Sequence, residues 1–279
     1  MQQKRKRHQR RAEPPPMRLT ERDIAIIEAV NQFRVLKQEQ IARLFFGSKA
    51  TAQFRLEKLY DHGFLERKFL PVLLGQGRSP TLYVLDRKGV ELLRTERGLE
   101  ELMWYPTSKD LKTDFLEHTI AINEVMVQVA VAARRRGFVL DTWRAEHELR
   151  ADYDHVVLTT GQGKRERVAV LPDSYFSLVA HQRRHHFFLE LDRGTMTSER
   201  FRSKVRAYIT YVSGGGYEKR YKTKSLRVLT VVSSGTSGER RLANLKAATE
   251  YVGASERFWF ATASALTAET ILDAPVWLV

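Results

Sequence analysis

Cysteine is absent from the sequence, and so are several motifs by which enzymes are recognised. None of the 279 residues is a cysteine, which excludes disulfides, thiolate zinc sites and cysteine nucleophiles. The sequence has no Gly-x-x-x-x-Gly-Lys phosphate loop and no Gly-x-Ser-x-Gly nucleophile elbow. It also lacks a cluster of tyrosine and histidine of the kind that nicks DNA. Nucleotide hydrolysis, serine hydrolysis and strand nicking therefore find no support.

Long apolar runs are also missing. No stretch approaches the roughly 20 consecutive apolar residues of a membrane-spanning helix. The N-terminus runs from Lys4-Arg5-Lys6-Arg7-His8 into polar residues with no apolar segment behind it. We therefore expect a cytoplasmic protein that is neither secreted nor membrane-embedded.

Positive charge is what the sequence has in excess. Its 47 Lys and Arg residues against 33 Asp and Glu residues give a formal net charge of +14 and a pI near 10.0. Such an excess is self-repelling unless phosphates or counterions screen it, so nucleic acid is the first expected partner and an anionic membrane surface the second. Residues 1–17 add Pro14-Pro15-Pro16 to the basic run, which predicts a disordered basic arm, either a solubilising tail or a phosphate-binding segment.

Hydrophobic periodicity predicts a compact domain over residues 18–100. The expected helices cover 20–33, 39–46, 49–62 and 87–97, and the expected strands cover 64–69 and 81–85. Thr20, Ser48 and Asp86 are suitable N-caps, while Gly47 and Gly63 follow helices as stops. Three helices, a hairpin and a further helix are the order of a winged helix-turn-helix domain.

The helix over 49–62 is the predicted DNA reader, because an α-helix fits the major groove. Gln53 matches adenine and Arg55 matches guanine, so both are expected base contacts, whereas Lys49 and Lys58 are expected on phosphate. Arg67, Lys68 and Arg78 lie on the hairpin, where Gly75 and Gly77 loosen the loop. The predicted DNA-binding residues are Lys49, Thr51, Gln53, Arg55, Lys58, Arg67, Lys68 and Arg78. The alternative is a set of solvated surface charges.

An α/β domain is predicted for residues 107–279. A long helix over 109–136 precedes strands at 139–144, 168–179 and 186–191. A helix over 198–211, a strand over 226–232, a helix over 240–251 and a strand over 258–261 follow. Helices and strands in this order pack as helices on a sheet. The fold class expected for the whole chain is therefore α+β, with a mixed sheet in the second domain.

Several segments together resemble the replication-relaxation family of plasmids and integrated mobile elements. They include Thr20-Glu21-Arg22-Asp23, Arg55-Leu56-Glu57-Lys58-Leu59, Lys88-Gly89, His118, Asn123, Trp143-Arg144-Ala145-Glu146 and the run from Phe188 to Gly194. The resemblance implies a DNA-binding protein that assists replication, mobilisation in conjugation, or transcriptional control of such an element. Two further possibilities stay open: that the protein forms a homodimer, and that it serves as a platform that recruits a relaxase or replication initiator.

The second domain is also similar to the PD-(D/E)XK core of restriction endonucleases. Asp173 follows Pro172, and Glu190 and Asp192 stand two residues apart on one predicted strand, so their side chains share a face. The similarity implies Asp173 and Glu190 as Mg²⁺ ligands, with Asp192 as a further catalytic acid.

The sequence departs from that pattern at one position. Asp192 stands where active members carry a lysine, so Lys204 on the following helix is the predicted substitute, and Glu146 a possible extra acid. Three alternatives stay open: an active Mg²⁺-dependent nuclease, a non-cleaving descendant, and a salt-bridge cluster with Arg193, Arg200 and Lys204. His185 and His186 are adjacent, so they are expected on opposite strand faces and not as paired metal ligands.

Overall fold

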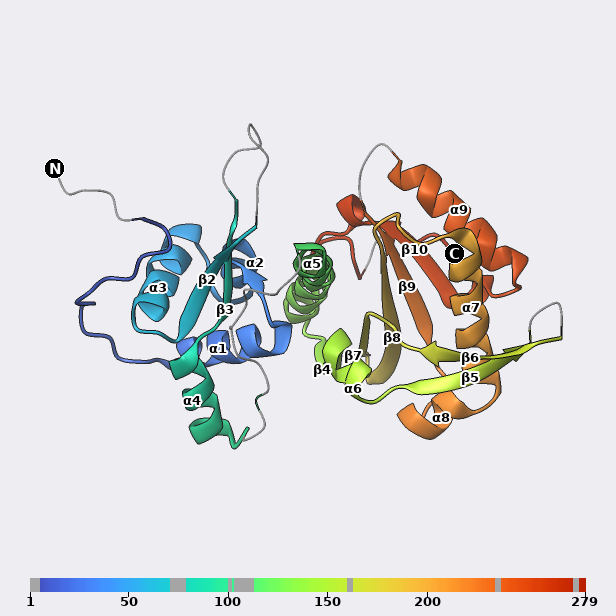
Figure 1. The fold of residues 1–279 in the computed structure, drawn as a ribbon, viewed down its shortest axis with the longest axis horizontal. Helices are drawn as coiled ribbons and strands as arrows, with labels where there is room; N and C mark the ends of the chain where they lie inside the picture. The colour runs from blue at the N-terminus through green and yellow to red at the C-terminus, as the bar shows by residue number, and fades with distance from the viewer. Residues whose placement is uncertain are drawn as a thin grey trace. The chain divides into compact units, whose positions relative to one another are not determined.

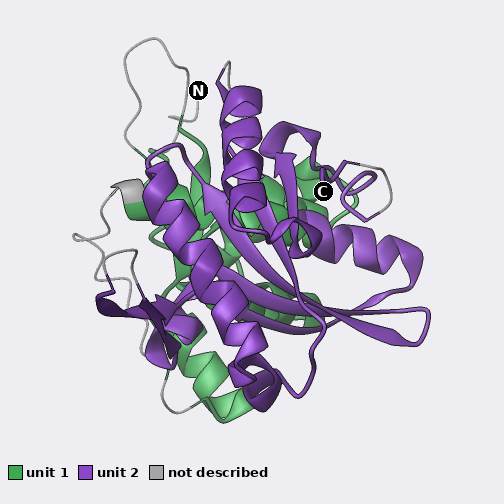
Figure 2. Ribbon diagram, turned by 90° about the vertical axis from the view of Figure 1, so that its right-hand side faces the viewer, with its two compact units in different colours: residues 1–127 green, residues 128–279 purple. Residues whose placement is uncertain are grey.

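The computed structural model describes residues 6–70, 79–99, 102, 113–159, 163–233, 237–272 and 276–279. The chain divides into two compact units, unit 1 (residues 1–127) and unit 2 (residues 128–279), drawn in green and purple in Figure 2. Helix α5 (Thr113–Arg136) crosses this division. The division therefore falls inside a helix, whereas the sequence suggested a joint between residues 100 and 107.

Unit 1 consists of helices around a small antiparallel sheet. Its elements before α5 are α1 (Glu21–Phe33), β1 (Leu36–Lys37), α2 (Gln38–Phe45), α3 (Lys49–Asp61), β2 (Leu65–Phe69), β3 (Thr81–Leu85) and α4 (Arg87–Arg97). The strand order is β1-β3-β2, and both pairings are antiparallel. Apart from β1, which is too short to show a periodic pattern, each element lies within a few residues of its predicted position.

Local signals place the ends of these helices. The Thr20 side chain accepts a hydrogen bond from the Asp23 N–H, and the Asp23 carboxylate accepts one from the Thr20 N–H, which completes a capping box. The Ser48 side chain caps α3 by accepting from the Thr51 N–H. Gly89 allows α4 to approach the hairpin, since a Cβ there would lie 2.3 Å from the Phe64 carbonyl oxygen.

The N-terminal arm differs from the expected disordered tail. From residue 6 onward the described arm is bonded to the hairpin and to α3 through three arginines. The pairs are Arg7 with Ser79 and Thr81, Arg10 with Leu65, Glu66 and Asp86, and Arg11 with Glu57 and Asp61. Guanidinium groups order the arm because they meet carboxylates and aromatic rings, which its composition alone does not reveal.

Helix α5 closes unit 1 and continues into unit 2. The buried Asn123 Nδ2 donates to the carbonyl oxygens of Phe33, at 3.0 Å, and Val35, at 2.6 Å, which satisfies the end of α1. Among the described residues, α5 is the helix long and apolar enough to cross a membrane, and half of its most apolar window is buried. Core helices share this composition, so one such helix is weak evidence of a span.

Unit 2 is a mixed five-stranded sheet with helices and a separate two-stranded ribbon. After α5 come β4 (Val139–Ala145), α6 (Glu146–Ala151), β5 (Asp154–Thr159), β6 (Arg165–Val170), β7 (Ser174–Ala180), β8 (Arg183–Asp192), α7 (Ser198–Ser213), α8 (Gly216–Tyr221), β9 (Arg227–Val232), α9 (Gly238–Tyr251), η1 (Ser255–Arg257), β10 (Phe258–Thr262) and η2 (Ala263–Ala265). The sheet order is β10-β9-β8-β7-β4, parallel across β10-β9-β8 and antiparallel across β8-β7-β4. The predicted α+β class and mixed sheet are confirmed.

The core of unit 2 lies between this sheet and α7, α8 and α9, which Figure 1 shows on one side of it. Phe188 on β8 is fully buried, and its ring centroid lies 5.3 Å from that of Tyr208 on α7 and 5.7 Å from that of Tyr217 on α8. Parts of the prediction were wrong. The single strand expected over 168–179 is two strands, β6 and β7, separated at Pro172. The strand β5 and the short helices α6 and α8 were not predicted.

Candidate functional site

Helix α3 exposes a continuous set of side chains at its N-terminal half. This α3 face consists of Lys49, Thr51, Gln53 and Phe54, and all four are exposed, the Phe54 side chain by 62%. The Lys49 Nζ atom lies 3.9 Å from a Glu39 carboxylate oxygen, but both side chains are largely in solvent, where such a pair contributes little. The α3 face is therefore exposed to solvent, and the assignment of Lys49, Thr51 and Gln53 to DNA stays a prediction.

Arg55, the predicted guanine reader, is engaged inside unit 1. Its Nε donates to Asp23 Oδ1 at 2.6 Å, its Nη2 contacts the other Asp23 oxygen, and Nη2 also donates to the Arg18 carbonyl oxygen at 2.8 Å. Burial of Asp23 acts to raise its pKa, but hydrogen bonds from Arg55 and Thr20 outweigh burial and lower the pKa. Because Asp23 is fully buried, Arg55 is required to balance its charge and ties α3 to α1.

The predicted hairpin contact Arg67 is also used internally. Its guanidinium carbon lies 4.3 Å from the ring centroid of Tyr60, and its Nε donates to the Tyr83 hydroxyl at 3.3 Å. A guanidinium stacked on one ring and bonded to another residue gains more from those contacts than from solvent. Arg67 therefore stabilises the junction of α3 and the hairpin, and its assignment to DNA stays a prediction.

The remaining predicted DNA contacts occupy different settings. Lys58 Nζ lies 4.9 Å from the Phe54 ring centroid, so its charge remains beside the α3 face. Lys68 is half-buried on β2. Arg78, with Gly75 and Gly77, lies outside the described residues.

The acids on the C-terminal half of α3 are paired by the N-terminal arm. Arg11 lies 3.7 Å from a Glu57 carboxylate oxygen and 3.4 Å from an Asp61 oxygen. This single guanidinium therefore offsets part of the negative charge that the two acids place near the α3 face. Nothing in the sequence suggested this pairing, which joins segments about 50 residues apart.

A second cluster of functional groups, the acid cluster, lies in unit 2. It consists of Glu146, Asp173 and Glu190 with Lys204. Lys204 Nζ binds one Glu190 carboxylate oxygen and the Tyr208 hydroxyl donates to the other.

Burial, together with the Asp173 charge, raises the pKa of Glu190 to about 7 despite Lys204. Burial acts to lower the pKa of Lys204, but the charges of Glu190, Asp173 and Glu146 outweigh it and raise the pKa.

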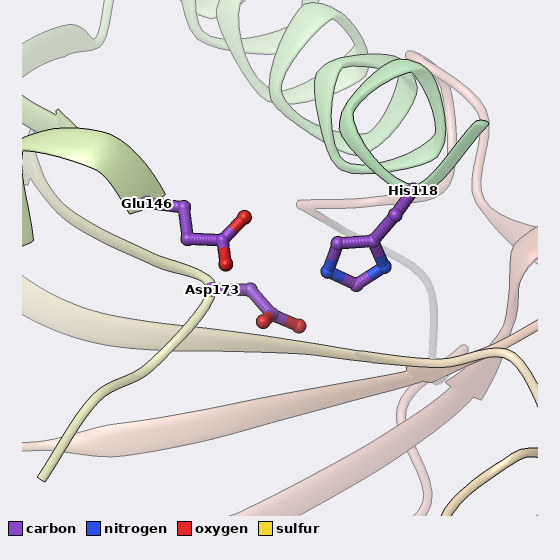
Figure 3. A group of neighbouring side chains, drawn as sticks. All are labelled: His118, Glu146 and Asp173. Atoms are coloured by element: carbon purple, nitrogen blue, oxygen red, sulfur yellow. The ribbon is translucent and has the colours of Figure 1, made fainter. Parts of the chain in front are cut away.

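Glu146 and Asp173 come from different elements and point toward one another. Glu146 begins α6, directly after β4, and Asp173 precedes β7. A carboxylate oxygen of one lies within 4.8 Å of an oxygen of the other. Figure 3 shows the two side chains. Asp173 Oδ2 accepts the Leu191 N–H at 2.7 Å, which holds it to the end of β8. The third side chain drawn in Figure 3, His118, lies on the part of α5 that belongs to unit 1.

Asp192, the other predicted catalytic acid, does not join the acid cluster. Its two carboxylate oxygens accept from Arg241 on α9, Nε at 3.0 Å and Nη2 at 2.6 Å, and Oδ1 also accepts the Gly194 N–H. The bidentate pair neutralises Asp192 and fixes it to α9. Of the salt-bridge alternative, the pair of Lys204 with Glu190 is present. The partner of Asp192 is Arg241, which neither spacing nor charge pattern identified.

The acid cluster fits a divalent cation only in part. Asp173 and Glu146 offer two carboxylates at neighbouring positions, the kind of donor that Mg²⁺ takes together with water. Glu190, the predicted second ligand, has both oxygens bonded to Lys204 and Tyr208, so it cannot coordinate without losing one of them. The pair that would hold Mg²⁺ is therefore Asp173 with Glu146, and Glu190 with Lys204 forms a neighbouring ion pair.

The adjacent histidines point to opposite sides of β8. His186 is buried, and its Nδ1 lies 2.8 Å from the Tyr175 hydroxyl. Burial, and then the Arg184 charge, lower the pKa of His186. His185 is exposed and lines a cavity on the other face with Phe176 and Phe187. The two rings thus belong to separate environments.

Comparison with known proteins gives a family and a weak structural likeness. A family model described as replication-relaxation matches residues 27–227. No curated protein matches the chain. Among solved structures, the chain is similar to the restriction endonuclease FokI, at 14% identity and a TM-score of 0.28, with 87% of this chain and 42% of that chain covered. The chain thus spans less than half the length of that endonuclease.

Proposed function

The chain belongs to the replication-relaxation family, and from that premise we propose that it is a double-stranded DNA-binding protein of a plasmid or integrated mobile element. In this proposal unit 1 acts as a winged helix-turn-helix domain, with α3 in the major groove and the hairpin beside it. The bound DNA serves replication, mobilisation or transcriptional control of the element. Which of these three processes the protein serves depends on the DNA sequence that it recognises.

The observation that carries this proposal is the α3 face. Lys49, Thr51, Gln53 and Phe54 are exposed on one half of a helix, and the acids on the other half are paired with Arg11. In a major groove, Gln53 can match adenine, Phe54 can contact a thymine methyl group and Lys49 can reach phosphate. The net charge of +14 supports attraction to the phosphate backbone.

The test is duplex binding by the full chain as salt is varied. About five phosphate contacts predict a slope near −4.5 in a plot of log affinity against log salt. The double variant K49Q/Q53A removes a phosphate contact and a base contact, so we expect affinity to fall by at least about tenfold. The matched control is K88Q, which removes an exposed charge from α4.

Two results would contradict the proposal. One is binding that does not change with salt, because phosphate contacts then play no part. The other is an affinity of K49Q/Q53A equal to that of K88Q while both proteins remain folded by circular dichroism.

A second candidate function, a Mg²⁺-dependent nuclease, is favoured by the acid cluster. Three carboxylates and a lysine from α6, the β7 end, β8 and α7 meet within unit 2. When bound there, Mg²⁺ would supply Lewis-acid activation of a phosphate or of water. Asp173 and Glu146 would hold the ion, while Lys204 would stay positioned by Glu190.

Plasmid cleavage tests this candidate. Supercoiled plasmid incubated with the full chain and Mg²⁺ or Mn²⁺ should be nicked or linearised, and D173A should lose that activity. The control E239A removes an exposed acid on α9 and should cleave as the unaltered protein does. A protein that cleaves nothing in either metal, or a D173A variant that keeps full activity, removes the nuclease from consideration.

A further inference from the structure

We propose that the outward face of the β5–β6 ribbon is a second DNA-binding surface, which inserts into the major groove of duplex DNA. The inference rests on the proposed function, since it assigns a further contact with the same ligand. It concerns unit 2 alone and does not involve the α3 face.

The ribbon is a two-stranded sheet separate from the five-stranded one. β5 and β6 pair antiparallel, from Asp154 opposite Val170 to Thr159 opposite Arg165. In Figure 1 the ribbon extends away from the five-stranded sheet, past α7. Val156 and Val170 pack into the core of unit 2, which fixes the base of the ribbon. One face is thereby anchored and the other is left to solvent.

Strand alternation defines what the free face carries. The register places His155, Val157 and Thr159 of β5 beside Ala169, Arg167 and Arg165 of β6. All of these except Ala169 are exposed. Two arginines, a histidine, a threonine and an exposed valine thus form one outward surface.

Charge on this face is of one sign. The ribbon's acids, Asp154 and Glu166, fall on the opposite face by the same alternation. Asp154 is bonded there to Tyr211 and, at 3.1 Å, to Arg220. On the outward face Arg167 donates to His155 Nδ1 at 3.1 Å, and among the described residues no acid pairs with Arg165 or Arg167. Such a face is complementary to a polyanion.

The shape selects duplex DNA among polyanions. Strands of a ribbon lie about 4.8 Å apart, and the B-form major groove, about 12 Å wide, admits a two-stranded ribbon. Arginine can grip guanine O6 and N7, and valine can contact a thymine methyl group. The deep, narrow major groove of duplex RNA excludes such an element. Single-stranded DNA is bound mainly by rows of stacked aromatic rings. The paired strands carry no Phe, Tyr or Trp, and the one exposed tyrosine beside them, Tyr153, has its ring centroid 4.8 Å from that of His155.

The test compares R165Q/R167Q with R183Q/R240Q in the full chain. The control removes the same charge from exposed positions at the β7–β8 turn and on α9. The probes are a fluorescent 40-base-pair mixed-sequence duplex, the single strand and the equivalent RNA duplex. We expect R165Q/R167Q to bind the DNA duplex roughly 10- to 60-fold more weakly at 0.1 M salt, with a salt slope smaller by up to about 1.8.

Charge reversal provides a second variant. R165E/R167E should bind duplex DNA more weakly still, and both variants should keep the melting temperature of the control because the side chains are exposed. Equal duplex affinity for R165Q/R167Q and R183Q/R240Q overturns the inference while leaving the α3 proposal intact. A loss confined to single-stranded DNA or duplex RNA also overturns it. Absence of duplex binding by the unaltered protein overturns both proposals.

Discussion

At the residue scale, burial decides which charged groups are available. Asp23 and Glu190 are both buried acids, but Asp23 is bonded by Arg55 and Thr20, which lowers its pKa, while burial of Glu190 outweighs Lys204. Two carboxylates with similar exposure thus behave in opposite ways. Burial and the nearby Asp173 charge dominate for Glu190, whereas the donors Arg55 and Thr20 dominate for Asp23.

Glu190 predicts a pH dependence of stability. Its pKa of about 7 in the folded protein lies above the value of about 4.3 for an unfolded chain. Because its pKa is raised on folding, the Glu190 carboxyl stabilises the folded protein fully below about pH 4.3, and this stabilisation is lost as the pH rises through about 7. We expect the free energy of unfolding to lose up to about 3 kcal/mol from this group between pH 4 and pH 8.

Denaturant unfolding across that range tests this expectation. The E190Q variant, which cannot ionise, should lack this loss and gain stability relative to the unaltered protein as the pH rises. E199Q is the control, because Glu199 is exposed and its pKa is lowered by Arg202. If the free energies of unfolding of E190Q and the unaltered protein changed in parallel with pH, burial would not be what raises the pKa of Glu190.

At the element scale, the N-terminal arm acts as part of unit 1. Arg10 donates to the Leu65 carbonyl oxygen at 3.2 Å and to Glu66 at 2.9 Å, binds Asp86, and lies 4.8 Å from the Tyr60 ring centroid. One side chain therefore joins α3, β2 and the start of α4. The arm stabilises the hairpin while pairing acids near the α3 face.

Arg10 predicts a stability effect. R10A should lower the free energy of unfolding by about 1 to 3 kcal/mol, because partly buried charge-assisted hydrogen bonds are lost. The free energy of unfolding of R10K should lie between those of R10A and the unaltered protein, since an ammonium cannot make the same planar contacts. Thermal melting measures this, with Q9A as a control because the Gln9 side chain is exposed. An R10A melting curve that matches Q9A would mean that the arm is not held by Arg10.

Helices were easier to predict than the ribbon. α1 and α3 combine apolar periodicity with a capping Thr20 or Ser48, two local signals that agree. β5 alternates buried and exposed residues over only six positions, and its partner β6 begins with the charged run Arg165-Glu166-Arg167. Short strands gain stability from a partner, so their own sequence carries little information.

At the scale of the whole molecule, charge and periodicity account for much of what the sequence predicts. The net charge of +14 indicates an anionic partner because charge is a sum over residues and needs no structure. The order of helices and strands is determined by local periodicity and capping in the same way, and it led to the α+β class that the structure confirms. Family membership over residues 27–227 agrees with these signals.

Only the tertiary structure decided which charged groups remain open to a ligand. Arg55 meets Asp23 across 32 residues, Arg241 meets Asp192 across 49, and Arg11 meets Asp61 across 50. The sequence by itself determined where the helices and most strands form, because neighbouring residues set those choices. It could not determine the ion pairs, because each depends on two distant segments being brought together and shielded from water.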